Sequence, residues 1–172
     1  MSSTTKRNRS VAATADTGKQ RLRLWLRLLR TTRGIEAELR ERMRVRFDST
    51  LPRFDVMAAL YREARMREAQ SAKPQGLTMT ALSRQLLVSN GNATVIVDRL
   101  EKDGLVARST AAGDRRSFVV SLTPQGLKQF RTMAAAHEGW IAEILSDIAP
   151  AHADLLLDIF DRRHALEPKD RQ

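Results

Sequence analysis

The feature that most restricts the fold is a short helix, a tight break and a second short helix between residues 77 and 104. Thr78 can cap a helix from Met79 to Leu87, because its hydroxyl can accept a hydrogen bond from a free amide of the first turn. The break Val88-Ser89-Asn90 follows, and either of its polar residues can cap the next helix, which Gly104 ends. This spacing predicts a helix-turn-helix.

Two strand patterns come directly after the helix pair. Leu105–Ser109 is strand-like, residues 110–114 suit a turn, and Phe118–Leu122 alternates apolar and polar side chains. A helix-turn-helix that runs into a hairpin is a winged helix-turn-helix. We therefore predict a winged helix-turn-helix domain with a two-stranded wing over residues 51–123.

Long amphipathic helices are predicted on both sides of this domain. From Gln20 to Phe47 apolar residues line two sides of one helix, so that helix has to contact two bodies, such as its own domain and a second chain. Thr123-Pro124 can cap and start another helix of about six turns, and Pro150 starts a last one. We interpret residues 19–50 and 124–168 as dimerisation helices, which makes the fold class mainly α (α+β).

The remaining segments are polar. A helix that begins at Pro52 is predicted to end near Met66, and the stretch from Arg62 to Gly76 is predicted to finish in a loop. Residues 1–18 are rich in Ser, Thr and Ala and carry several cations. We interpret them as a disordered basic arm, with an organelle transit peptide as the alternative.

Positive charge is concentrated at the N-terminal end. The 172 residues include 30 Lys and Arg against 20 Asp and Glu, a formal net charge of +10. Residues 1–47 hold 13 basic and 4 acidic side chains, whereas residues 127–172 hold 6 basic and 8 acidic ones. Such an excess favours a polyanionic partner, since each cation placed on a phosphate releases counterions.

Missing residue types and motifs exclude several classes of function. Cysteine is absent, which excludes disulfides, thiolate metal sites and cysteine nucleophiles. No run approaches 18 apolar residues, so we expect no membrane span. The three histidines lack metal-ligand spacing, and neither a phosphate loop nor a nucleophile elbow is present. We expect a cytoplasmic protein that is not an enzyme and holds no metal or cofactor.

The second helix of the pair carries residue types that read DNA bases. Asn92, Val95 and Arg99 recur at helical spacing opposite the apolar face. In the major groove an Asn can pair with adenine, an Arg with guanine, and a Val can touch a thymine methyl group. The candidate DNA-contacting residues of this helix and its cap are Ser89, Asn90, Asn92, Thr94, Val95 and Arg99. The alternative is a solvated helix face.

The hairpin tip adds a second candidate contact. Arg115 and Arg116 suit the narrow minor groove, where negative potential is concentrated, and Asp114 can hold one of them by a charge-assisted hydrogen bond. Arg108, on the first strand of the hairpin, is predicted to reach a phosphate.

Three motifs of the chain resemble the MarR family of bacterial transcriptional regulators. They are Leu-Thr-Met-Thr-Ala-Leu-Ser at 77–83, Val-Asp-Arg-Leu-Glu-Lys-Asp-Gly-Leu-Val at 97–106 and Asp-Arg-Arg-Ser-Phe-Val-Val-Ser-Leu-Thr-Pro-Gln-Gly at 114–126. The resemblance covers residues 20–166. It implies a homodimer that binds a pseudo-palindromic operator in double-stranded DNA, with one winged domain per half-site. It also implies a repressor that a small, often aromatic, effector releases.

The first helix and residues 51–57 are similar to family members that control aromatic-acid catabolism. This similarity implies an aromatic acid or its coenzyme A thioester as the effector. The candidate effector-binding residues are Trp25, Arg30, Phe54, Met57, Tyr61 and His137. The alternative for the apolar ones is ordinary core packing. Three rival functions stay open: a sequence-indifferent architectural DNA-binding protein, a winged helix used for protein contacts, and a regulator without an effector.

Overall fold

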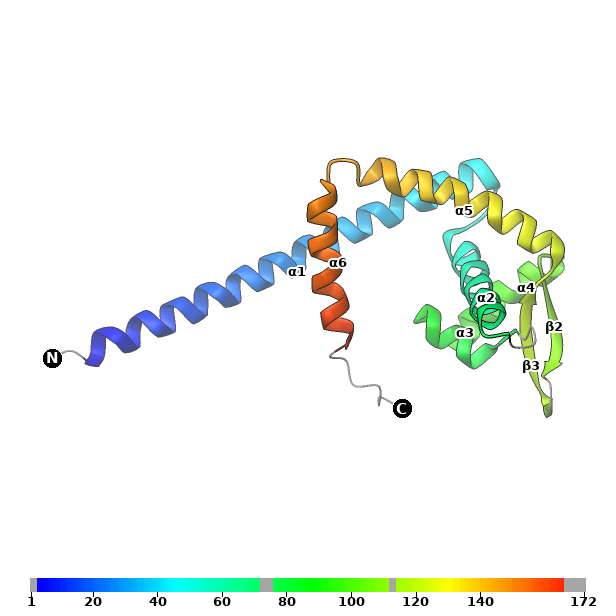
Figure 1. Ribbon diagram of the computed structural model, residues 1–172, viewed down its shortest axis with the longest axis horizontal. Coiled ribbons are helices and arrows are strands. Elements are labelled where there is room, and N and C mark those ends of the chain that lie inside the picture. The colour runs from blue at the N-terminus through cyan, green and yellow to red at the C-terminus, as the bar shows by residue number, and fades with distance from the viewer. Residues whose placement is uncertain (1–2, 72–75, 112–113, 166–172) are drawn as a thin grey trace.

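The computed structural model describes residues 3–71, 76–111 and 114–165, which form six helices and a small sheet. The elements in chain order are α1 (Ser3–Phe47), α2 (Leu51–Ala69), β1 (Leu77–Thr78), α3 (Met79–Leu86), α4 (Asn90–Lys102), β2 (Val106–Ala111), β3 (Asp114–Leu122), α5 (Pro124–Ile144) and α6 (Pro150–Ala165). Helices α2 to α5 and the sheet form a compact lobe, from which the N-terminal half of α1 projects (Figure 1). The prediction of a mainly helical winged helix-turn-helix with long terminal helices is confirmed.

The sheet has three strands, one more than predicted, in the antiparallel order β1-β3-β2. In β1, Leu77 pairs with Val120 and Thr78 with Val119. Two residues are too few for an alternating pattern, which is why the sequence did not predict this strand. Thr78 also caps α3 as predicted, because its hydroxyl accepts the amide of Ala81 at 3.2 Å.

The junction between the wing and α5 is built around close backbone approaches. Thr123 caps α5 by accepting the amide of Gly126 at 3.0 Å, and its hydroxyl donates to the carbonyl of Gly104 at 2.7 Å. Gly104 has a φ of 71°, which favours glycine. A Cβ at Gly126 would lie 1.9 Å from the carbonyl oxygen of Leu105, so only glycine lets α5 start against the wing.

Two segments are more helical than predicted. Helix α2 continues to Ala69, because the ion pairs Arg67–Glu63 and Arg65–Glu68 join residues that are one turn apart. Helix α1 begins at Ser3, so residues 3–18 form helix where the sequence predicted a disordered arm. This segment contains several alanines and basic residues, which are good helix formers, and it has no proline.

The core lies where α2 packs on α3, α4, α5 and the sheet. Its largest fully buried side chains are Met43, Met57, Leu82, Leu100, Met133, Val56, Val97 and Val120. Phe54 stacks between Phe130, at 5.6 Å between ring centroids, and His137, at 4.7 Å. Helix α1 joins this core only through its C-terminal half, where Leu39 and Met43 are buried.

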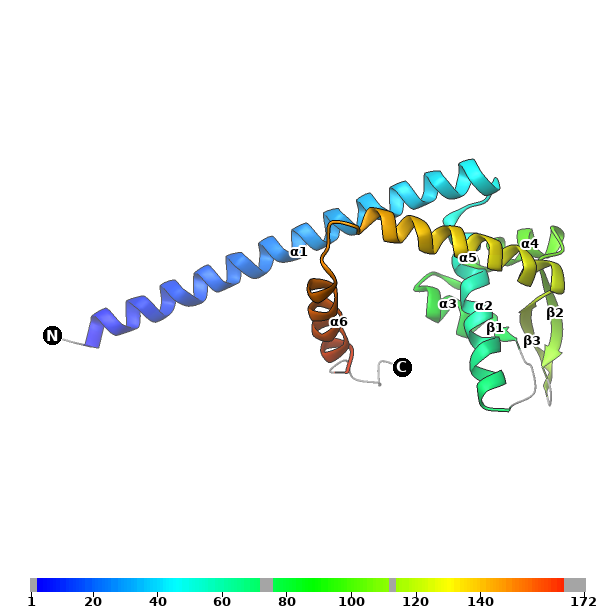
Figure 2. The ribbon, with the colours of Figure 1, turned by 45° about the horizontal axis from the view of Figure 1, so that its top comes forward.

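The outer parts of α1 and α6 carry large apolar side chains that the chain itself leaves exposed. On α1 these are Leu22, Leu24, Trp25 and Leu26, each between 54% and 58% exposed. On α6 they are Leu155, Leu156, Leu157, Ile159 and Phe160. Figure 2 shows both segments standing clear of the compact lobe. In the described part of the chain, no helix combines the length and apolarity needed to cross a membrane.

Candidate DNA-binding surface

Helix α4, the second helix of the helix-turn-helix, is held by its neighbours at both ends. At its N-terminus the buried Ser83 of α3 donates a hydrogen bond to the side-chain oxygen of Asn90. At its C-terminus Asp103 forms an ion pair with Arg53 of α2. These contacts fix the position of α4 relative to α2 and α3.

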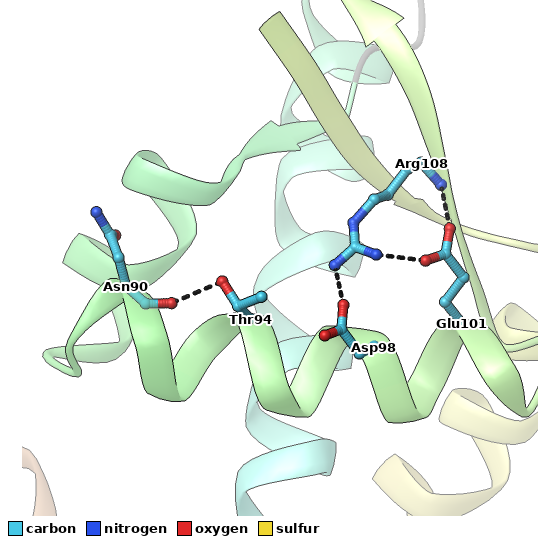
Figure 3. A network of polar contacts seen from close by, with 5 residues as sticks. All are labelled: Asn90, Thr94, Asp98, Glu101 and Arg108. Carbon is cyan, nitrogen blue, oxygen red and sulfur yellow. Dashed lines mark hydrogen bonds and ion pairs between the residues drawn. The ribbon is translucent and has the colours of Figure 1, made fainter.

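The wing is joined to α4 by a network of polar contacts. The guanidinium of Arg108 on β2 pairs with the carboxylates of Asp98 and Glu101 on α4, and Glu101 also accepts the backbone amide of Arg108 at 3.3 Å (Figure 3). The hydrogen bond with Asp98 is the main reason why the pKa of Arg108 is raised. The structure places the guanidinium of Arg108 against α4, and the phosphate contact predicted for it stays a prediction.

An exposed row on α4 remains available for a partner. Asn92, Val95 and Arg99 all face solvent, and Val95 is 53% exposed. Within the described residues, the side-chain amide of Asn92 and the guanidinium of Arg99 form no hydrogen bond. The opposite face, with Ala93, Val97 and Leu100, is buried. The prediction of which face of α4 is buried and which is exposed is therefore confirmed.

The other predicted residues of this helix have structural partners. Ser89 caps α4 by accepting the amide of Asn92 at 3.3 Å. The hydroxyl of Thr94 donates to the carbonyl of Asn90 at 2.8 Å, as Figure 3 shows, while the Asn90 side chain is held by Ser83. Asn90 and Thr94 therefore shape the first turns of α4.

The tip of the wing lies partly outside the described residues. Backbone pairing places Ala111 opposite Asp114, so the turn is shorter than the predicted 110–114, and Arg115 and Arg116 belong to strand β3. The side chains of Asp114, Arg115 and Arg116 are not among those that the structure describes, and their minor-groove contact stays a prediction.

The six candidate effector-binding residues do not share one cavity. Trp25 and Arg30 are exposed on the projecting part of α1, whereas Phe54 and Met57 are buried in the core. His137 is half-buried against Phe54, and this burial lowers its pKa. Helical spacing predicts which face of its own helix a residue occupies. It does not predict how far that residue lies from residues on other elements.

Tyr61 lines a groove of about 910 Å³ between α2, the wing and the start of α5. The groove is also lined by Arg65 of α2, Ser109 of β2, Ser121 of β3 and Arg131 of α5. Glu68 lines it too and pairs with Arg65, so the groove combines an aromatic ring, hydroxyl groups and one cationic side chain, Arg131, beside that ion pair. Such a lining suits a small molecule with an aromatic or apolar body and an anionic group.

Sequence reasoning missed the residues that hold the surface together, namely Ser83, Arg53, Asp103, Asp98 and Glu101. One signal was present: Asp98 and Glu101 are three residues apart, so they share a face of α4 and can bind one cation together. Ser83, Arg53 and Asp103 gave no such signal, because their partners lie on other elements.

The fold and this surface define a winged helix-turn-helix protein with long flanking helices. The sequence profile of the MarR family matches residues 50–118. The uncharacterised HTH-type transcriptional regulator YfiV of Bacillus subtilis is 32% identical over 87 residues, which are 51% of this chain and 48% of YfiV. The transcriptional activatory protein BadR of Rhodopseudomonas palustris is 33% identical over 75 residues, 43% of each chain. The chain thus spans about half the length of the curated relatives it matches.

A solved structure extends this similarity over the whole fold. The crystal structure of a MarR family transcriptional regulator from Silicibacter pomeroyi is 32% identical to this chain, with a TM-score of 0.66. The match covers 88% of this chain and 96% of that one. The chain belongs to the MarR family of transcriptional regulators, which is not a family of enzymes.

Proposed function

We propose that the chain is a homodimeric transcriptional regulator that binds a pseudo-palindromic operator, with one winged domain on each half-site. The observation that carries this proposal is the exposed row Asn92, Val95 and Arg99 on a helix that its neighbours fix from several sides. A rigid helix that presents an amide, a methyl-bearing side chain and a guanidinium matches what the major groove offers.

Each residue of the surface then has a distinct role. Asn92 recognises an adenine edge, Arg99 a guanine edge or a phosphate, and Val95 a thymine methyl group. Asn90 and Thr94 shape the helix start that approaches DNA, and Arg108 sets the angle between wing and helix. Arg115 and Arg116 enter the minor groove.

The exposed apolar faces of α1 and α6 support the homodimer. Complete burial of a large apolar side chain contributes about 1.5–3 kcal/mol, and several side chains on both helices are still about half exposed. Their location away from α4 and the wing leaves both winged domains free to contact DNA (Figures 1 and 2).

The groove beside Tyr61 is the proposed effector site, and a small aromatic acid or its coenzyme A thioester is the proposed effector. Arg131 can bind its anionic group, whereas Arg65 already pairs with Glu68 in the same lining, and Tyr61 can pack against its ring. Because the groove joins α2, the wing and α5, a ligand that favours a different wing position lowers operator affinity. Release of a repressor is the proposed outcome, although one relative, BadR, is named as an activator.

Fluorescence anisotropy tests the proposal directly. The protein is titrated onto duplex DNA from upstream of its own gene and onto a scrambled duplex of the same composition, across a salt series. Aromatic acids and their thioesters are then added. We expect preferential binding to the upstream duplex and its loss on addition of an effector. Equal binding to both duplexes would instead favour the architectural alternative, which the net charge of +10 supports.

A further inference from the structure

Phe118 on the wing is a large apolar side chain that the described chain leaves uncovered. It is 58% exposed, whereas the next two residues of β3, Val119 and Val120, are 4% and 0% exposed. Among the described aromatic residues it stacks on no other ring. Strand β3 therefore changes from a buried segment to an exposed one at Phe118.

The register of the sheet shows which way Phe118 faces. Arg108 is paired with Val120 and Thr110 with Phe118, and the ladder becomes irregular only after Thr110. Alternate residues of one strand share a face of the sheet, and so do directly opposed residues of two antiparallel strands. Phe118, Val120 and Arg108 therefore lie on one face, from which Arg108 reaches Asp98 of α4 (Figure 3). Phe118 is on the side of the wing that faces α4.

The opposite face of the wing belongs to the groove beside Tyr61. Val119 and Ser121 alternate with Phe118 along β3, and both of them line that groove, whereas Phe118 does not. The proposed effector site therefore gives no role to Phe118.

Phe118 lies nearer the tip of the wing than the ion pairs that join the wing to α4. Arg108, at the level of Val120, pairs with Asp98 and Glu101. Phe118 is two residues farther towards the tip, about 7 Å along the strand. The two arginines proposed for the minor groove are the next but one and the next but two residues in that direction. Along the wing, Phe118 is thus between the contact with α4 and these arginines.

We propose that Phe118 packs against a deoxyribose of the DNA strand that separates the two grooves. This inference rests on the proposed DNA binding, in which α4 enters the major groove and Arg115 and Arg116 enter the adjacent minor groove. One sugar–phosphate strand borders both of these grooves, so the wing has to cross that strand between α4 and the arginines. Phe118 lies in this part of the wing and on the side that faces α4.

The chemistry of the side chain fits a sugar and not a phosphate. The ring of Phe118 offers neither a hydrogen-bond donor nor a positive charge. Arg108, on the same face, is paired with two carboxylates. The carbon-bound hydrogens of deoxyribose are the apolar part of the DNA backbone, and packing the ring on them removes apolar area from water. Because every nucleotide carries the same sugar, this contact does not depend on the base sequence.

The test removes the ring and keeps the strand. Phe118→Thr retains a β-branched residue, and Phe118→Leu retains an apolar side chain. Val45→Thr is the control, because Val45 is 69% exposed but lies on α1, outside the helix-turn-helix and the wing. Anisotropy on the upstream and scrambled duplexes across a salt series measures binding, and urea midpoints measure stability. Hydroxyl-radical footprints report the contact itself, since these radicals cleave DNA by attacking the deoxyribose.

For Phe118→Thr we expect the affinity for both duplexes to fall by about 5- to 15-fold for each winged domain in contact. The slope of log K against log salt stays unchanged, because no charge is removed. In the footprint, sugars between the α4 contact and the wing-tip contact lose protection. Phe118→Leu keeps most of the affinity, and Val45→Thr binds like the wild type.

Four results would overturn the inference. The first is wild-type affinity and footprint in Phe118→Thr. The second is a lower urea midpoint together with a lower salt slope, which would mean that the ring only holds the wing and its arginines in place. The third is weaker binding to the upstream duplex alone, which would indicate a base contact. The fourth is a lower mass of Phe118→Thr in sedimentation velocity, which would assign the ring to the second subunit.

Failure of the proposed function gives a different result. If the wild type binds the upstream and scrambled duplexes equally, the operator proposal fails. The scrambled duplex then still decides whether Phe118 contacts DNA, because the proposed contact is independent of sequence. If the wild type protects no sugar on either duplex, both proposals fail.

Discussion

At the scale of single residues, the proposed base recognition needs side chains whose polar ends have no partner among the described residues. Asn92 and Arg99 meet this condition, whereas Asn90 and Thr94 do not. We expect Asn92→Ala or Arg99→Ala to weaken operator binding by about 1–3 kcal/mol and to relax selectivity at one base position. Anisotropy with operator duplexes altered one base pair at a time measures both effects. Arg163→Ala, at an exposed position on α6, is the control, and wild-type affinity in the Asn92 and Arg99 variants would refute their assignment.

His137 gives the fold a dependence on pH. Burial lowers its pKa below the value of 6.5 that it has in an unfolded chain. As the pH falls below about 6.5 the unfolded chain therefore takes up a proton that the folded chain refuses, and the free energy of unfolding decreases. His137→Phe keeps a ring against Phe54 and removes this titration. Urea midpoints at pH 7.5 and 5.5 should differ less in that variant than in the wild type.

The matched control for this effect is the exposed His152→Gln. The His137 contribution would be disproved if His137→Phe and the wild type lost the same stability between the two pH values.

At the scale of elements, the position of the wing depends on the link between β2 and α4. If Arg108 positions the wing through Asp98 and Glu101, Arg108→Gln weakens operator binding and leaves the salt slope unchanged. Asp98→Asn removes a partner and has the same effect. If Arg108 instead binds a phosphate, Arg108→Gln lowers the slope by about 0.9 and Asp98→Asn strengthens binding. The two variants together separate these roles.

The wing also depends on the backbone contact between Leu105 and the start of α5. A Cβ at Gly126 would lie 1.9 Å from the Leu105 carbonyl, so Gly126→Ala has to shift the wing or the helix. We expect it to destabilise the fold by about 1–3 kcal/mol. Gly139→Ala on the same helix is the control, because nothing lies within 4 Å of a Cβ there, and it should be neutral or stabilising by up to about 1 kcal/mol. Chemical denaturation measures both, and equal midpoints would contradict the proposed contact.

At this scale, the sequence predicts features that depend on neighbouring residues and misses features that depend on residues far apart in the chain. Helix caps and helical spacing are local patterns. The caps Thr78 and Thr123, and the exposure of Asn92 and Arg99 on one face of α4, could therefore be predicted. Strand β1 and the pairs of Arg108 join segments that are apart in the chain, and spacing within one element says nothing about them. For the same reason helical spacing gives no distance between two of the candidate effector-binding residues, Trp25 on the projecting helix and Phe54 in the core.

At the scale of the whole molecule, the proposed operator binding depends on the proposed dimer. A dimer binds two half-sites as one unit, because the second half-site is bound at the high effective concentration that the first contact creates. Phe160→Glu places a charge on the apolar face of α6, where burial without a partner is strongly unfavourable. We expect this variant to populate monomers at concentrations where the wild type is dimeric, as sedimentation velocity measures.

The DNA readout of the same variant separates assembly from recognition. Affinity for a full operator should fall towards the affinity for a single half-site duplex, while the half-site affinity itself stays unchanged, since Phe160 is remote from α4. Val45→Glu is the control: Val45 is 69% exposed on α1 and lies about 28 Å along the helix from Leu26, the last of its exposed apolar residues named above, so this variant should remain dimeric. If Phe160→Glu stays dimeric as well, α6 does not form the interface, and the exposed leucines of α1 become the surface on which the two subunits have to meet.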